Sequence, residues 1–187
     1  MPEIKKITGR ASGTVFKYIK EVEVLPKFRD ALRVKQGGSK ERARKKWLEA
    51  KERVASTLGE ISDRDRLLVL AAIYWGEGSK GEFNLINGDP YLIRSFLKGL
   101  YTLGVPKSEI RLGLRIFAGM DIQKTIFFWT NFLNIDQKQL VGYEILKGGD
   151  NKRLIYGMCR VRIVRAAAYF KSVISMIDYI KLESTPP

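Results

Sequence analysis

The strongest constraint on this chain is an apolar run at residues 67–75, LLVLAAIYW, which is followed by Gly76-Glu77-Gly78. A helix that is apolar on nearly every side belongs in a core or in a contact between helices. The run is too short to span a bilayer, so we expect it to be buried in protein. Ala72 and Gly76 are one helical turn apart, which would let a second helix approach closely. The pattern therefore predicts a contact between two helices, which we call the seam, with the acid Glu77 at its end.

The start of this helix is also marked in the sequence. Ser62-Asp63-Arg64-Asp65 fits a capping box, in which Ser62 is the cap and Asp65 stands where Glu is usual. We therefore expect a helix over residues 63–76.

Residues 70–78, LAAIYWGEG, resemble the motif of the LAGLIDADG homing endonucleases. The matching positions are Leu70, Ala71, Ala72, Ile73, Gly76, Glu77 and Gly78. Trp75 departs from the pattern, because Asp is common there. The family's metal-binding acid is the eighth motif position, so the resemblance implies that Glu77, with the backbone of Gly76, binds a metal. It covers about residues 62–180, and beyond the motif it is an agreement of element order.

Composition limits the chemistry and suggests a partner. The 187 residues contain 34 Lys and Arg against 20 Asp and Glu, a formal charge of +14, which points to a polyanion such as nucleic acid. There is no His and only one Cys, which excludes a Cys/His zinc site, a disulfide framework and His-dependent catalysis. Carboxylates and a hard metal, Mg²⁺, are then the natural tools of an enzyme. With no signal sequence or membrane span, we expect an intracellular protein of the cytoplasm or nucleoid, without membrane or small-molecule cofactor partners.

The N-terminal segment resembles part of a helix-turn-helix. Helical spacing of apolar residues on both sides of Gly9 predicts two short helices, which would match the second and third helices of such a unit. On that alignment the recognition helix would offer Thr14, Lys17 and Lys20 to DNA. An amphipathic hairpin with a solvated basic face is the alternative. We expect the unit to be incomplete, because the chain begins too late to encode its first helix.

The chain divides into four predicted parts. Residues 1–36 are the helix-turn-helix-like segment, and residues 37–60 are a basic linker helix that follows a glycine-rich hinge at 37–39. Residues 61–182 form the LAGLIDADG-like domain, and residues 183–187 are a tail. The basic linker helix is either a solvated connection or a strap that follows phosphates.

In the third part, alternation and helical spacing predict strands at 82–86, 110–117, 140–146 and 156–164 and helices at 91–103, 125–133 and 166–180. The order of elements is the one expected for a LAGLIDADG domain with an extra helix. We therefore predict an α+β fold, a LAGLIDADG-type αββαββα domain with an antiparallel sheet, preceded by a small helical region.

Arginines alternate with apolar residues on two of these strands. Arg111 and Arg115 share one side of the first strand, and Arg160 and Arg162 share one side of the second, where alternate residues lie about 7 Å apart. With almost no acids expected beside them, the face suits phosphates or guanine edges in the major groove; an exposed polar face without a partner is the alternative. Basic residues outside the two strands that we also assign to DNA binding are Lys80, Lys152 and Arg153.

One Glu per chain is a thin set of ligands for Mg²⁺, whereas two copies of Glu77 would be enough, so a single motif implies a homodimer with both copies at its seam. Our first hypothesis is a site-specific, divalent-metal-dependent endonuclease that cuts double-stranded DNA as a homodimer. The alternatives are a non-cutting DNA-binding transcriptional regulator on the same fold and an RNA-binding splicing helper. RNA stays open because positive charge indicates a phosphate backbone and does not distinguish DNA from RNA.

Overall fold

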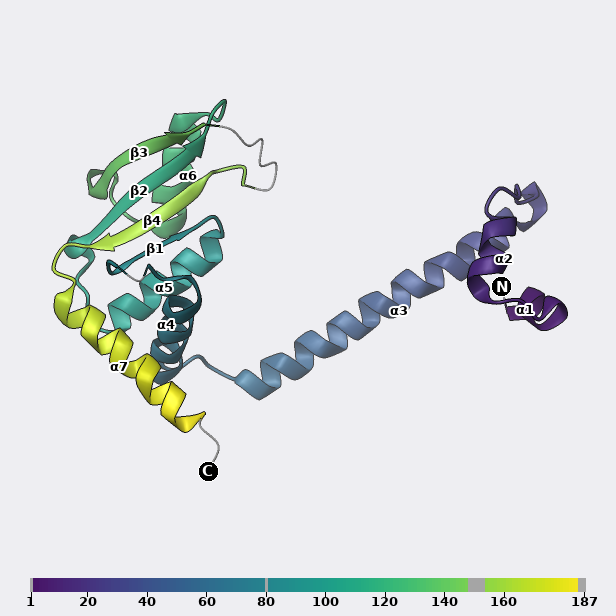
Figure 1. The fold of residues 1–187 in the computed structure, drawn as a ribbon, viewed down its shortest axis with the longest axis horizontal. Helices are drawn as coiled ribbons and strands as arrows, with labels where there is room; N and C mark the ends of the chain where they lie inside the picture. The colour runs from purple at the N-terminus through teal and green to yellow at the C-terminus, as the bar shows by residue number, and fades with distance from the viewer. Residues whose placement is uncertain (1, 80, 148–153, 185–187) are drawn as a thin grey trace. The chain divides into compact units, whose positions relative to one another are not determined.

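A computed structural model describes residues 2–79, 81–147 and 154–184, and of residues 33–39 it describes only the backbone. The chain divides into two compact units, Met1–Gly59 and Glu60–Pro187. Figure 1 shows the helices and strands of each unit.

The N-terminal unit is helical. Helix α1 (Pro2–Thr8) and helix α2 (Ser12–Ile19) flank a turn at Gly9, whose φ of 64° is one that glycine adopts without strain. Long helix α3 (Pro26–Leu58) follows, with Pro in its first turn and Gly59 at its C-cap. Among the described side chains of this unit, only Val15 is buried. The described side chains of this unit therefore form almost no apolar core.

The predicted hinge at residues 37–39 is wrong, because α3 runs through it without a break. The predicted boundary between residues 36 and 37 consequently falls inside a helix. Each glycine in a helix interior costs only about 1 kcal/mol relative to alanine. The surrounding Ala, Leu, Lys, Arg and Glu are strong helix formers, which explains why a pair of glycines does not end this helix.

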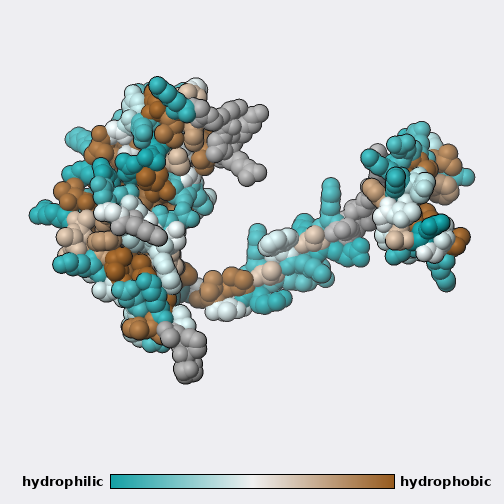
Figure 2. Space-filling view, viewed as in Figure 1, coloured by the Kyte–Doolittle hydropathy of each residue, from teal (hydrophilic) through white to brown (hydrophobic). Residues whose placement is uncertain are grey.

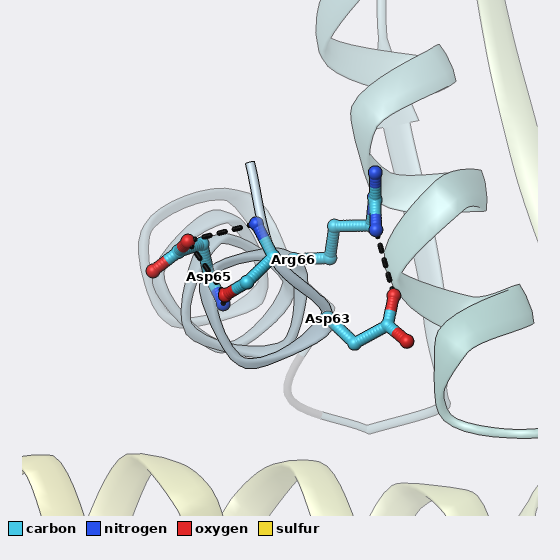
Figure 3. A network of polar contacts seen from close by, with 4 residues as sticks. Asp63, Asp65 and Arg66 are labelled. Atoms are coloured by element: carbon cyan, nitrogen blue, oxygen red, sulfur yellow. Dashed lines mark hydrogen bonds and ion pairs between the residues drawn. The ribbon is translucent and has the colours of Figure 1, made fainter. Parts of the chain in front are cut away.

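The C-terminal unit begins with helix α4 (Asp63–Glu77), which carries the motif. Its predicted capping box is present: the Asp65 amide donates to the Ser62 hydroxyl, and the Ser62 amide donates to the Asp65 carboxylate at 2.9 Å. Figure 3 shows this network beside the ion pair between Asp63 and Arg66. The hydrogen bonds from Ser62 lower the pKa of Asp65, so the cap uses the charged carboxylate.

The remaining elements lie close to their predicted positions. They are β1 (Asn84–Asn87), α5 (Pro90–Thr102), β2 (Ile110–Phe117), α6 (Ile122–Leu133), β3 (Leu140–Leu146), β4 (Met158–Ile163) and α7 (Ala167–Glu183), with short 3₁₀ turns at Lys107–Glu109 and Gln137–Gln139. The class is α+β, as predicted. From α4 onward, however, the described order is αβαβαββα: before α5 there is one short strand and an isolated bridge between Gly78 and Leu85.

The four strands form one sheet in the order β1-β4-β2-β3. Strand β4 pairs antiparallel with β1 and β2, but β2 and β3 are parallel, so the prediction of an antiparallel sheet is wrong. Helix α6 connects the end of β2 to the start of β3. Such a crossover returns the chain to the same end of the sheet, and the second strand then runs parallel to the first.

One face of the sheet carries the core. Residues Ile110, Leu112, Leu114 and Ile116 of β2 are all buried there. Helices α4 and α5 contact β1, and α6 contacts β2. The Trp129 side chain of α6 is fully buried, and its indole N–H donates to the Tyr156 carbonyl at 2.7 Å. The residues that alternate with these on β2 point to the opposite face of the sheet and are only partly buried.

Candidate nucleic-acid interface

Arginines occupy the sheet face opposite the core. Burial alternates along β2, so Arg111 and Arg115 point away from the buried side. Antiparallel pairing places Arg162 opposite Arg111 and Arg160 opposite Gly113, and residues paired in this way project to the same face. Four arginines from two neighbouring strands thus share one surface, which we call the arginine face.

Two glutamates accompany these arginines, and the expectation that the face has almost no acids is wrong. Arg162 Nη2 lies 2.9 Å from Glu82 Oε2, and Arg115 Nε lies 3.1 Å from Glu144 Oε2. The hydrogen bond from Arg162 lowers the pKa of Glu82. Because all four side chains are partly exposed, these ion pairs contribute little to stability and mainly reduce the positive charge of the face.

Glycines leave the centre of the arginine face without side chains. Gly113 of β2 is paired with Gly142 of β3, just after a register shift at Leu112 and Gly113. A groove of about 210 Å³ lies there, lined in part by Arg115, Glu144 and Arg160. A neighbouring groove of about 510 Å³ includes Arg111, Arg162 and Glu82, and Val141 lines both. The face therefore has room for a ligand to approach the strand backbones.

Two guanidinium groups on this face differ in their partners. Arg111 Nη1 donates to the carbonyls of Ser108 at 2.8 Å and Ile110 at 2.9 Å, which holds its side chain against the start of β2. Arg160 Nε is buried and has no hydrogen-bond partner among the described residues. A buried donor without a partner costs about 1–3 kcal/mol.

Sequence reasoning missed Glu82, Glu144 and Gly142 as members of this face. Glu144 and Gly142 alternate on a strand that was predicted, so their shared side was visible in the sequence. Their position beside β2 depends on parallel pairing and on the register shift, neither of which has a local sequence signal.

The motif acid, Glu77, is the last residue of α4 and is exposed. The side-chain amide of Asn87 donates to Glu77 Oε2 at 3.4 Å, a long hydrogen bond that connects the helix end to β1. Gly78 must be glycine, because an added Cβ would collide with Tyr74. This tight turn fixes where the carboxylate leaves the helix.

The donors at this end of α4 fit a hard cation such as Mg²⁺ in kind, because carboxylate oxygen is its usual protein ligand. Gly76 lies within the last turn of the helix, where carbonyls have no partner within the helix. Within the described ranges no group of three or more His, Cys, Asp or Glu side chains could hold a metal ion. The fit therefore rests on Glu77 and backbone oxygens of one chain.

One side of α4 is both apolar and exposed, and it is the side that carries the predicted seam. It presents Leu68, Val69, Ala72, Trp75 and Gly76 at successive helical turns, with Trp75 50% exposed. Open space surrounds Gly76, since an added Cβ would meet no atom within 4 Å. The opposite side of the same helix is core, with Leu70, Ala71 and Tyr74 buried. The Lys181 ammonium lies 5.7 Å from the centre of the Trp75 ring.

In the N-terminal unit, Thr14 and Lys17 lie exposed on α2, and Lys20 is exposed directly after it. Helices α1 and α2 form the pair expected from the sequence. Of the other predicted contacts, Lys80, Lys152 and Arg153 lie outside the described residues.

Comparison with protein-family models, with curated proteins and with solved structures finds no match. In the described part of the chain no helix has the length and apolar character needed to cross a membrane.

Proposed function

We propose that the protein is a site-specific, divalent-metal-dependent endonuclease of double-stranded DNA that acts as a homodimer, as LAGLIDADG homing endonucleases do. One observation carries the proposal: the exposed apolar side of α4, with Ala72 and Gly76 along it, ends at the exposed carboxylate of Glu77. An apolar helix side of this kind is typical of a contact with another helix.

Pairing two copies of α4 along this side would bring two Glu77 carboxylates together. Small side chains at Ala72 and Gly76 permit a close approach of the helix axes. Asn87 would orient each carboxylate through its hydrogen bond. A Mg²⁺ ion bound by the pair would supply activation of water and neutralisation of the leaving oxygen, the chemistry that a protein without histidine needs for phosphodiester hydrolysis.

DNA would lie on the arginine face. Guanidinium groups bind phosphate oxygens or the guanine edge through two donors at once, and a strand pair fits the major groove. Arg160 and Arg115 border the glycine-lined groove, where a phosphate or base edge can reach the sheet closely. Glu82 and Glu144 would then act against non-cognate contacts, because each neutralises one arginine until a correctly placed acceptor replaces it.

The direct test is incubation of the purified full-length protein with genomic DNA of its source and Mg²⁺, followed by sequencing of new DNA ends. The matched control is Glu77→Gln, which keeps the size of the side chain and one acceptor oxygen but removes its charge. Discrete ends that require both Glu77 and Mg²⁺ support the proposal. Ends produced equally by the variant contradict the role of Glu77.

A non-cutting DNA-binding regulator is the second candidate, and the helix pair α1 and α2 favours it, because Thr14 and Lys17 are exposed on the second helix. Trp75, at a motif position where Asp is common, favours it as well. This second function would be supported if the wild-type protein and the Glu77→Gln variant both bind duplex DNA tightly and in a salt-sensitive way, and neither produces new DNA ends. Stronger competition by structured RNA than by duplex DNA would instead favour an RNA-binding splicing helper.

A further inference from the structure

Positive charge is concentrated in the N-terminal unit. Residues 1–59 contain 16 Lys and Arg against 7 Asp and Glu, a charge of +9 out of the +14 of the whole chain. Most of it lies on α3, and Figure 2 shows hydrophilic side chains along much of this helix. This charge belongs to a different unit from the arginine face, so it needs an explanation of its own.

One stripe of α3 combines cations with an exposed aromatic ring. Lys40, Arg44, Trp47 and Lys51 follow one another at intervals of four, three and four residues, which places them on the same side of the helix. The Trp47 side chain is 70% exposed. A groove of about 450 Å³ beside it is lined by Arg44, Trp47, Leu48 and Lys51 among others. Arg44 forms an exposed ion pair with Glu41, one turn away, at 2.7 Å, which reduces its positive charge.

The chemistry of this stripe selects among possible occupants. Its four positions contain three cations and no acid, and Glu41, the acid that also lines the groove, is paired with Arg44, so a second copy of the same stripe offers little complementary charge. A polyanion does. Duplex DNA would use the cations but leave the indole of Trp47 in water, because its bases are already stacked. An unpaired base can stack on the indole while its phosphates meet the flanking cations.

We propose that the stripe Lys40, Arg44, Trp47 and Lys51 of α3 is a binding site for single-stranded DNA. A base stacks on Trp47, and the phosphates on either side contact Arg44 and Lys51. The choice of DNA over RNA rests on the proposed function, whereas the single-strand preference rests on Trp47 alone.

The test uses the full-length protein and an oligo-dT of about 20 nucleotides, long enough for one binding element. In a Trp75→Phe background Trp47 is the most exposed of the remaining indoles, since Trp129 is fully buried. We expect oligo-dT to quench its fluorescence. Trp47→Ala should lower the affinity for oligo-dT about 10- to 100-fold, as expected for loss of one stacked base. Trp47→Phe should retain most of the affinity, and Leu48→Ala, an apolar truncation in the same groove, should change it little.

Duplex DNA distinguishes this inference from the proposed function. Trp47→Ala should leave duplex affinity nearly unchanged, whereas Arg115→Ala combined with Arg160→Ala should weaken duplex binding and spare oligo-dT. If neither variant loses duplex binding, the arginine face is contradicted and the α3 site is unaffected. Wild-type affinity of Trp47→Ala for oligo-dT would overturn the α3 site, as would conversion of a dimer to monomers by this substitution. Tighter binding of oligo-U than of oligo-dT would overturn DNA as its partner.

Discussion

Arg115 on β2 and Glu144 on β3 are register partners across the parallel pair, and Arg115 Nε lies 3.1 Å from Glu144 Oε2. The same acid therefore neutralises a predicted DNA contact and lines the groove at the centre of the arginine face. A partly exposed pair of this kind stabilises the fold by no more than about 1 kcal/mol. Its main consequence concerns binding rather than folding.

Glu144→Gln should strengthen duplex DNA binding. Removal of the carboxylate releases Arg115 for a phosphate, which we expect to raise the affinity about two- to fivefold. The slope of log affinity against log salt concentration should steepen by up to about one released counterion. Fluorescence anisotropy with a labelled duplex over a range of salt concentrations measures both. Glu60→Gln makes the same change of charge at an exposed residue at the start of the unit. Equal effects of the two substitutions would mean that only net charge matters.

Ala72→Leu should separate the proposed homodimer into monomers. The larger side chain would hold two α4 helices apart, at a cost of about 1–3 kcal/mol for each copy. Because Ala72 is exposed, the melting temperature of the monomer should not fall. Sedimentation equilibrium gives the dissociation constant, and Ala168→Leu, at an exposed position of α7, is the control. A dimer of unchanged strength in the Ala72 variant would reject α4 as the seam.

Asp65→Asn should destabilise the C-terminal unit only where Asp65 is charged. Its pKa is held below the ordinary 3.8 by the hydrogen bonds from Ser62, so its contribution is present above that value. The contribution is lost as pH falls through the folded pKa. Urea unfolding at about pH 6 should separate the variant from wild type, and the difference should shrink as pH falls below about 3.8. Asp63→Asn removes a first-turn charge and leaves the capping box intact, so a matching pH profile would implicate the helix dipole instead.

Gly99→Ala should destabilise the contact between α4 and α5. A Cβ at position 99 would lie 2.6 Å from Leu70 Cβ and 3.1 Å from the Arg66 carbonyl, so the helices must move apart. We expect a loss of about 1–3 kcal/mol in the free energy of unfolding, although alanine is the better helix former. Gly81→Ala, where the added Cβ meets nothing within 4 Å, is the control. Stabilisation of the Gly99 variant would show that the two helices pack less tightly than described.

Local signals in the chain were sufficient for most of the elements. The capping box predicted the start of α4, and alternation predicted β2 to the residue. Both signals act within a few residues, through a hydrogen bond in one case and through opposite side-chain directions in the other. The two glycines in α3 mislead for the same reason: a local signal for a hinge is outweighed by the helix formers on either side.

By itself, the sequence determined the charge of +14, the absence of histidine, the apolar run of α4 and the carboxylate at its end. Only the tertiary structure decided that β3 lies parallel to β2, that Glu144 and Glu82 neutralise two arginines, and that the side of α4 with Ala72 and Gly76 is exposed while the side with Leu70 is core. Each of these depends on contacts between segments far apart in the chain. Such contacts follow from how crossovers and packed helices close together, and no local pattern encodes them.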